Sequence, residues 1–127
     1  SSDVCSSDLP IAYLEDQDFD SSGNLVAQGI PGGMPVVIML QSSWCKHCST
    51  AKPEFQAFAN ATEGRVFCAT VQVDGERDTE KALGSRIKTI KPNLRGYPDY
   101  LLYKNGIRID REIQGREVRH LRDFSSI

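Results

Sequence analysis

The feature that most constrains the fold is a succession of five apolar residues, two closely spaced cysteines and an amphipathic stretch. The apolar run, Val36 to Leu40, is short and rich in β-branched residues, which is typical of a strand buried on both faces. From Cys48 onward, apolar side chains recur at helical spacing, at Ala51, Phe55, Phe58 and Ala59. The pattern predicts a buried strand that leads into a helix, with Cys45 and Cys48 at the helix start. Pro53 falls within this helix and is expected to kink it.

Shorter apolar runs on either side of this unit predict an α/β fold. We expect strands at 11–14, 65–74, 100–103 and 107–113, a loop or short helix after the first strand, and helices at 79–87 and 117–124. The dipeptide Asn105-Gly106 between two apolar runs is a strong hairpin signal. Elements in this order predict a layered α/β fold with a mixed central β-sheet flanked by helices.

The 127 residues fit one domain. Residues 1–9 repeat Ser-Ser-Asp and include Cys5, and we expect them to be a non-native or disordered segment outside the fold. The predicted domain therefore covers residues 10–127.

Composition excludes several classes of function. A net charge of −2 with both signs scattered along the chain gives no basic surface for nucleic acid. The longest apolar run is far too short to cross a bilayer, so no transmembrane segment is expected.

The four cysteines leave three possibilities: two disulfides, a zinc site, or a redox pair with bystanders. A zinc site needs a second pair of ligands, whereas Cys5, Cys68 and His120 each stand alone. A structural disulfide scaffold is not expected in a chain long enough to build its own core. We therefore expect neither a metal nor a cofactor, and Cys68, within an apolar run, should be a buried and inert thiol.

Two cysteines separated by two residues at a helix start suit reversible disulfide chemistry. The unpaired amides and positive dipole end of the helix stabilise a thiolate, so Cys45 is the expected nucleophile. Cys48, one turn further along, is the expected resolving thiol, which attacks a mixed disulfide formed on Cys45. Positive charge at Lys46 and His47 would favour the dithiol form and make the pair more oxidising.

The segment Trp44-Cys45-Lys46-His47-Cys48, with Pro53, resembles the active site of the thioredoxin superfamily, and its histidine is similar to the protein disulfide isomerase branch. Gly96-Tyr97-Pro98 is similar to the segment that holds the family's cis-proline, and the resemblance extends from about Ile11 to Phe124. It implies a thioredoxin fold, a cis Tyr97–Pro98 bond beside the cysteines, and a Tyr97 backbone that pairs with substrate.

Four positions depart from the family pattern. Met39 stands where a buried acid is usual, and Thr70 stands where a lysine often accompanies that acid. Asp99 follows Pro98 in place of threonine, and its carboxylate could partly offset His47. Lys46 replaces a glycine or proline.

The resemblance implies an enzyme that reduces, oxidises or isomerises disulfides of protein substrates, with an unidentified redox partner. His47 favours an isomerase-like poise, and a thioredoxin-like general reductant is the alternative. A different class is a non-catalytic module that holds extended peptide in the groove at Pro98.

Overall fold

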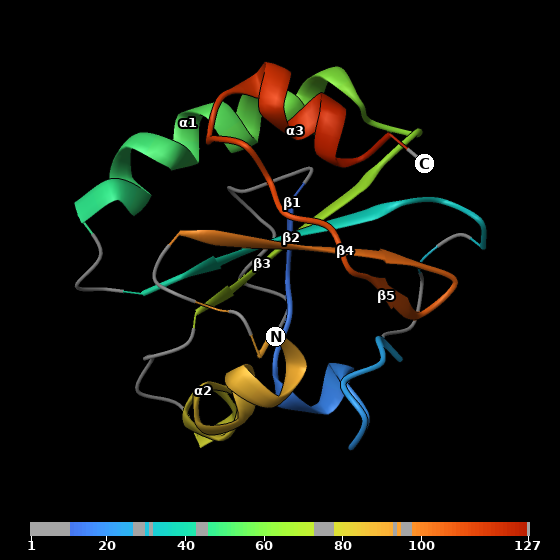
Figure 1. The fold of residues 1–127 in the computed structure, drawn as a ribbon, viewed down its shortest axis with the longest axis vertical. Helices are drawn as coiled ribbons and strands as arrows, with labels where there is room; N and C mark the ends of the chain where they lie inside the picture. The colour runs from blue at the N-terminus through green and yellow to red at the C-terminus, as the bar shows by residue number, and fades with distance from the viewer. Residues whose placement is uncertain are drawn as a thin grey trace.

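The computed structural model describes residues 11–26, 30, 32–42, 46–72, 78–92, 94 and 98–126. Figure 1 shows a central sheet with helices on both sides. The elements in chain order are β1 (Ile11–Tyr13), η2 (Asp16–Asp18), β2 (Val36–Gln41), α1 (Lys46–Ala61), β3 (Phe67–Gln72), α2 (Asp78–Ile90), β4 (Asp99–Lys104), β5 (Ile107–Ile109) and α3 (Val118–Phe124). The segment at residues 1–9 lies outside the described residues.

The five strands form one mixed sheet in the order β1-β3-β2-β4-β5. β3 pairs in parallel with both β1 and β2, and β4 pairs antiparallel with β2 and β5. β2 lies in the middle, and all six of its residues are buried. This placement confirms the prediction from the apolar run at 36–40, because a central strand covered on both faces has no solvent side.

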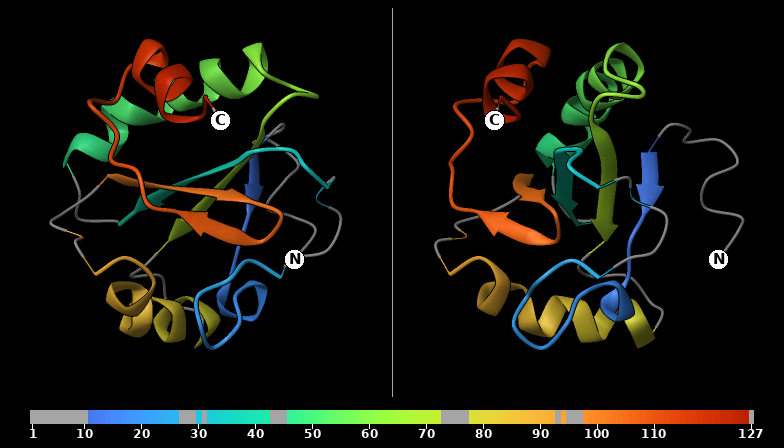
Figure 2. Two further views of the ribbon diagram at one scale, coloured as in Figure 1. Left: turned by 45° about the vertical axis from the view of Figure 1, so that its right-hand side comes forward. Right: turned by 90° about the vertical axis from the view of Figure 1, so that its right-hand side faces the viewer.

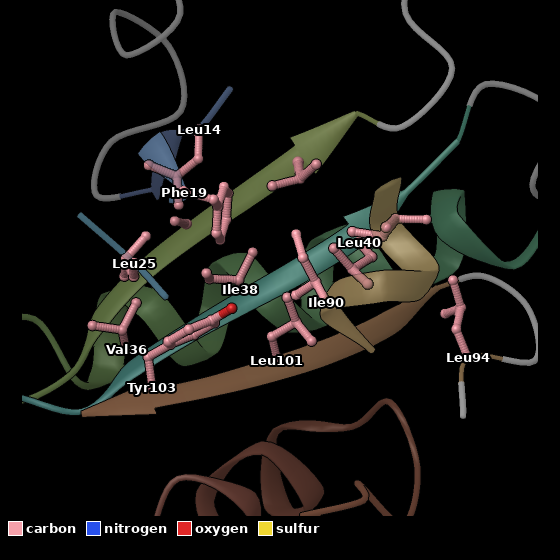
Figure 3. Packing of buried hydrophobic residues seen from close by; sticks show 13 residues of the cluster. Leu14, Phe19, Leu25, Val36, Ile38, Leu40, Ile90, Leu94, Leu101 and Tyr103 are labelled. Atoms are coloured by element: carbon pink, nitrogen blue, oxygen red, sulfur yellow. The ribbon is translucent and has the colours of Figure 1, made fainter. Parts of the chain in front are cut away.

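Helices cover the two faces of the sheet in separate layers. α1 and α3 lie together on one face, and α2 lies with η2 on the other (Figures 1 and 2). Alternate residues of β2 therefore point into two different cores. Val37 and Met39 pack with the apolar stripe of α1, whereas Val36, Ile38 and Leu40 pack on the α2 side (Figure 3).

The turn between β4 and β5 is the hairpin that Asn105-Gly106 predicts. Both residues have positive φ angles, 54° and 83°, as a two-residue type I′ turn requires. The Asn105 side-chain oxygen accepts a hydrogen bond from the Gly33 amide at 2.8 Å, which fixes the turn against the segment before β2.

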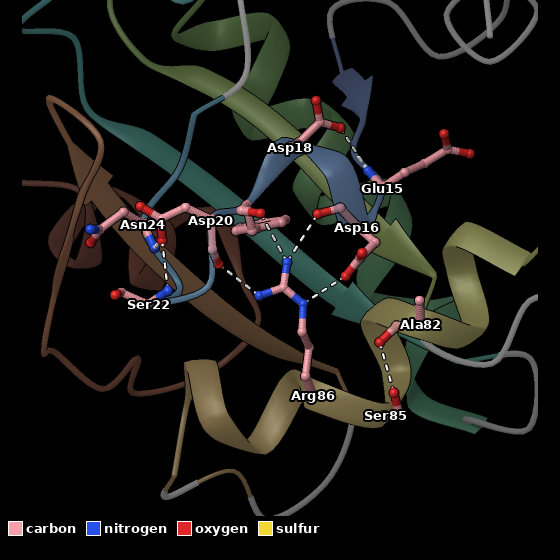
Figure 4. A network of polar contacts seen from close by, with 10 residues as sticks. Glu15, Asp16, Asp18, Asp20, Ser22, Asn24, Ala82, Ser85 and Arg86 are labelled. Atoms are coloured by element: carbon pink, nitrogen blue, oxygen red, sulfur yellow. Dashed lines mark hydrogen bonds and ion pairs between the residues drawn. The ribbon is translucent and has the colours of Figure 1, made fainter.

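One arginine attaches the acidic segment after β1 to α2 (Figure 4). Arg86 Nε donates to the Asp16 carboxylate at 2.6 Å, and its two terminal nitrogens donate to the carbonyls of Asp16, Phe19 and Asp20 at 2.7–3.0 Å. The guanidinium thereby gives three backbone carbonyls a charged donor, two of which, those of Asp16 and Asp20, also accept from the amides of Phe19 and Gly23.

Three predicted boundaries need correction. α2 continues to Ile90 rather than ending at 87, because Ile90 extends the buried stripe begun by Ile87, and Pro92 follows soon after. β5 ends at Ile109, and Ile113 packs against the core under α1 and α3 instead of extending the strand. β3 begins at Phe67 rather than at 65, and positions 73 and 74 lie outside the described residues. No helix among the described residues is long and apolar enough to cross a membrane.

Candidate active site

The start of α1 and the start of β4 lie at the same end of the sheet. β2 ends at Gln41, and α1 begins at Lys46, so the cysteine segment connects the two. The antiparallel register places Leu40 opposite Asp99, which brings Pro98 to this same end (Figure 1, left). Lys46 and Pro98, more than fifty positions apart in the sequence, therefore lie at the same end of the sheet.

The helix start predicted at the motif is confirmed, because Lys46, His47 and Cys48 form the first turn of α1. A helix start presents backbone amides without intrahelical partners and the positive end of the dipole. Trp44, Cys45 and Tyr97 lie outside the described residues, as do the side chains of 46–48. The positions of the two sulfurs and the cis Tyr97–Pro98 bond thus stay predictions.

The apolar side chains of α1 pack against the sheet. Ala51, Phe55, Phe58 and Ala59 are buried, as the stripe predicted, and the ring of Phe55 packs 6.0 Å from that of Tyr100 on β4. Pro53 is exposed on the outer side of the helix. Burial of this kind contributes about 1.5–3 kcal/mol for each large side chain and fixes the helix start relative to the sheet.

Met39 and Thr70, two of the positions that depart from the family pattern, lie side by side on neighbouring strands. Met39 on β2 is fully buried and is the register partner of Thr70 on β3. The Thr70 hydroxyl donates to the Met39 carbonyl at 2.9 Å and accepts from the Gln41 side-chain amide at 2.7 Å. A neutral hydrogen-bonded chain therefore occupies the place where the resemblance implies an acid and a lysine.

Asp99, next to Pro98, forms part of a buried ion pair. The Lys91 side chain is completely buried, and its Nζ donates to the Asp99 carboxylate at 2.8 Å and to the Tyr100 carbonyl at 3.2 Å. Glu112 lies 3.3 Å from the same nitrogen. Since the Asp99 charge is compensated by Lys91, its expected effect on Cys45 is weaker than the sequence alone suggested.

Sequence reasoning missed Lys91 as part of this site. A carboxylate at the start of a strand as buried as 100–103 needs a cationic partner, and that requirement was the available signal. The nearest lysine at the end of the preceding helix, Lys91, meets it.

Two buried hydroxyl groups near this end are without hydrogen-bond partners in the described part of the chain, Ser42 Oγ and Tyr100 OH. Burial raises the pKa of the Tyr100 phenol above its ordinary value, so this group stays protonated. Burial also raises the pKa of the Cys68 thiol to about 12. Cys68 is thus the buried, inert thiol that the sequence predicted.

Comparison with known proteins assigns the class. The family model for thioredoxin matches residues 11–126, so the chain belongs to the thioredoxin family. The thioredoxin of Malassezia sympodialis superposes with a TM-score of 0.62 over 91% of both chains at 21% identity, which confirms the thioredoxin fold.

Two relatives illustrate the range within the family. The chain is 37% identical over 112 residues to the thioredoxin-like protein 453L of Invertebrate iridescent virus 6, a match that covers 80% of each protein. It is 28% identical over 96 residues to protein disulfide-isomerase A5 of Bos taurus, covering 76% of this chain and only 16% of that enzyme. Thioredoxin-like and isomerase-like proteins are both similar to it.

Proposed function

We propose that this chain is a thiol–disulfide oxidoreductase that acts on protein disulfides through Cys45 and Cys48. The observation that supports the proposal is that α1 begins at Lys46, within the Cys-x-x-Cys segment, shortly after a fully buried central strand, and that Pro98 lies at the same end of the sheet. Membership of the thioredoxin family supports it.

The proposed reaction begins with the Cys45 thiolate, which attacks one sulfur of a substrate disulfide. A bond forms between Cys45 and that sulfur, and the other substrate sulfur leaves with the electron pair and takes up a proton. Cys48 then attacks Cys45, so that the Cys45–Cys48 disulfide forms and the substrate leaves as a dithiol. The substrate disulfide is reduced by two electrons and the protein is oxidised by two.

The peptide around the substrate disulfide is proposed to lie against the start of β4. The backbone next to Pro98 is the proposed partner for an extended peptide, as in strand addition. The helix-start amides of α1 are proposed to stabilise the attacking thiolate. Protein thiols or disulfides are therefore the substrate class, and a redox partner must return the pair to its starting state.

The direction of the proposed reaction depends on the reduction potential. His47 and Lys46 supply positive charge at the helix start, which supports an isomerase-like poise over that of a thioredoxin-like reductant. Potentials typical of those two classes differ by roughly 90 mV, about 4 kcal/mol for two electrons. Titration of the Cys45–Cys48 pair against glutathione separates them.

The decisive experiment compares two variants in insulin-disulfide reduction. Cys45→Ser should abolish turnover, whereas Cys48→Ser should accumulate a mixed disulfide on Cys45 that mass spectrometry detects. Cys68→Ser serves as the matched control and should retain wild-type turnover, because that thiol is buried away from the site. Equal turnover by all three variants and the wild type would eliminate the proposed activity.

A further inference from the structure

Lys91, just after α2, carries a buried ammonium group that contacts two later segments of the chain. Its side chain is 0% exposed, and Nζ donates to the Asp99 carboxylate at 2.8 Å and to the Tyr100 carbonyl at 3.2 Å. A Glu112 carboxylate oxygen lies 3.3 Å from the same nitrogen. These oxygens match the three N–H donors of an ammonium group, so one side chain joins the end of α2, the start of β4 and the segment after β5.

The Lys91 backbone is itself held in place. Its amide donates to the Ile87 carbonyl at 2.9 Å, which continues the hydrogen bonding of α2, and its carbonyl accepts from the Leu94 amide at 3.1 Å. Ile87 and Ile90 anchor the end of α2, because both are buried in the core on that face of the sheet. The ammonium is therefore carried by a backbone position that the core fixes.

The ion pair binds the backbone of β4 beyond the end of β5. Ile109, the last residue of β5, pairs with Leu102, so Tyr100 lies past the end of that strand. The Tyr100 amide donates to the Asp99 carboxylate at 2.8 Å, and the Tyr100 carbonyl accepts from Lys91. Both backbone groups of Tyr100 thus have side-chain partners, which fixes the course of the chain immediately after Pro98.

Stability alone does not account for a buried ammonium in this place. A buried ion pair often contributes no more to stability than apolar side chains of the same volume, because both charges lose their hydration. Its geometry is nevertheless specific, since charged hydrogen bonds hold their partners at short distances. The pair supplies a defined backbone position between Pro98, which is partly exposed, and Tyr100, which is buried.

We propose that Lys91 is a positioning residue for protein substrates, which fixes the start of β4 so that the backbone at Pro98 can pair with the peptide beside a substrate disulfide. This inference rests on the proposed function, in which an extended peptide lies against the start of β4. Because Lys91 is buried, it acts through Asp99 and Tyr100 and does not touch the substrate. A disulfide without flanking peptide should therefore depend less on Lys91.

The test compares insulin with bis(2-hydroxyethyl) disulfide, which has no peptide backbone. The full chain is reduced and mixed with either compound, and the second-order rate constant is measured by quenched thiol labelling and mass spectrometry. Lys91→Met should lower the ratio of the two rate constants, insulin over small disulfide, about tenfold, because a shift of the pairing backbone misplaces only a substrate that uses it.

Two further variants separate positioning from loss of stability. The double variant Lys91→Met with Asp99→Asn removes both charges, so it should unfold at a higher urea concentration than Lys91→Met alone but keep the lowered ratio. Arg86→Met is the matched control, because Arg86 is also a cation of α2 with several hydrogen bonds, but its partners lie in the segment after β1. It should leave the ratio at the wild-type value.

An unchanged ratio in Lys91→Met, or a ratio that recovers together with stability in the double variant, overturns the inference while leaving the proposed function intact. An equal fall of the ratio in Arg86→Met would show a general effect of destabilisation and would also overturn the inference. A wild type that reduces neither disulfide overturns the proposed function itself, and the inference with it.

Discussion

Replacing Asp99 by asparagine is the most informative test of the buried ion pair beside Pro98. Asparagine keeps the shape and an oxygen for the Tyr100 amide, which donates to Asp99 at 2.8 Å, but it removes the charge that faces Lys91. The Lys91 side chain is 0% exposed, so its ammonium loses its nearest compensating charge without gaining water.

The size of the effect follows from what surrounds that ammonium. Breaking a buried pair by removing one partner costs about 3–5 kcal/mol. Glu112 still lies 3.3 Å from Lys91, but its side chain is 50% exposed and compensates only in part. We therefore expect Asp99→Asn to lower the free energy of unfolding by about 2–3 kcal/mol, measured by urea denaturation at pH 7.

Two further variants make the reasoning refutable. Glu112→Gln should cost less than about 1 kcal/mol, as for an exposed pair. The double variant Asp99→Asn with Lys91→Met should be more stable than Asp99→Asn alone, because it removes the stranded charge. A double variant less stable than the single one, or a loss under about 0.5 kcal/mol for Asp99→Asn, contradicts the account of a buried and coupled pair.

Three other changes have expected outcomes. His47→Pro should lower the reduction potential of the cysteine pair by roughly 30 mV, about 1.4 kcal/mol, in a glutathione titration; an unchanged or higher potential means that another residue sets it. Cys68 should resist alkylation at pH 8 in the folded protein. Because burial raises the pKa of the Cys68 thiol from 9.0 to about 12, the free energy of unfolding should be highest below pH 9 and fall toward pH 12. Cys68→Val removes this thiol and should therefore reduce that fall in urea titrations. Arg86→Met should cost about 1–3 kcal/mol, because three carbonyls and the Asp16 carboxylate each lose the hydrogen bond from the guanidinium; calorimetry showing an unchanged midpoint would refute this.

The sequence predicts the elements best where one local rule is sufficient. The β-branched content and short length of Val36 to Leu40 favour a buried strand, and the spacing of Ala51, Phe55 and Phe58 favours a helix face. Both predictions are confirmed. Asn105-Gly106 marked the hairpin because few sequences tolerate two positive φ angles. The end of α2 at Ile90 was not predicted, because no local pattern shows that Ile90 packs in the core on this side of the sheet.

The site was predictable as a motif but not as an assembly. The opening of α1 at Lys46 follows from the chain order of strand and cysteines. The pairing of Lys91 with Asp99 depends on how the end of α2 meets β4, which no local pattern encodes. The unpartnered Tyr100 hydroxyl is similarly visible only in three dimensions, since tyrosine in a buried strand is otherwise an ordinary core residue.

The antiparallel pairing of β2 with β4 has a kinetic consequence. Leu40 and Asp99 are cross-strand partners separated by about sixty residues, and closing a loop of that length costs roughly 3.6 kcal/mol of chain entropy before any contact forms. Contacts of such high order slow folding, because the loop entropy is lost before the contact stabilises the chain. Cys45 and Cys48 are only three residues apart, so bringing them together closes no long loop. The two cysteines are thus neighbours along the chain from the outset, whereas the strand that bears Pro98 reaches this end of the sheet only when β4 pairs with β2.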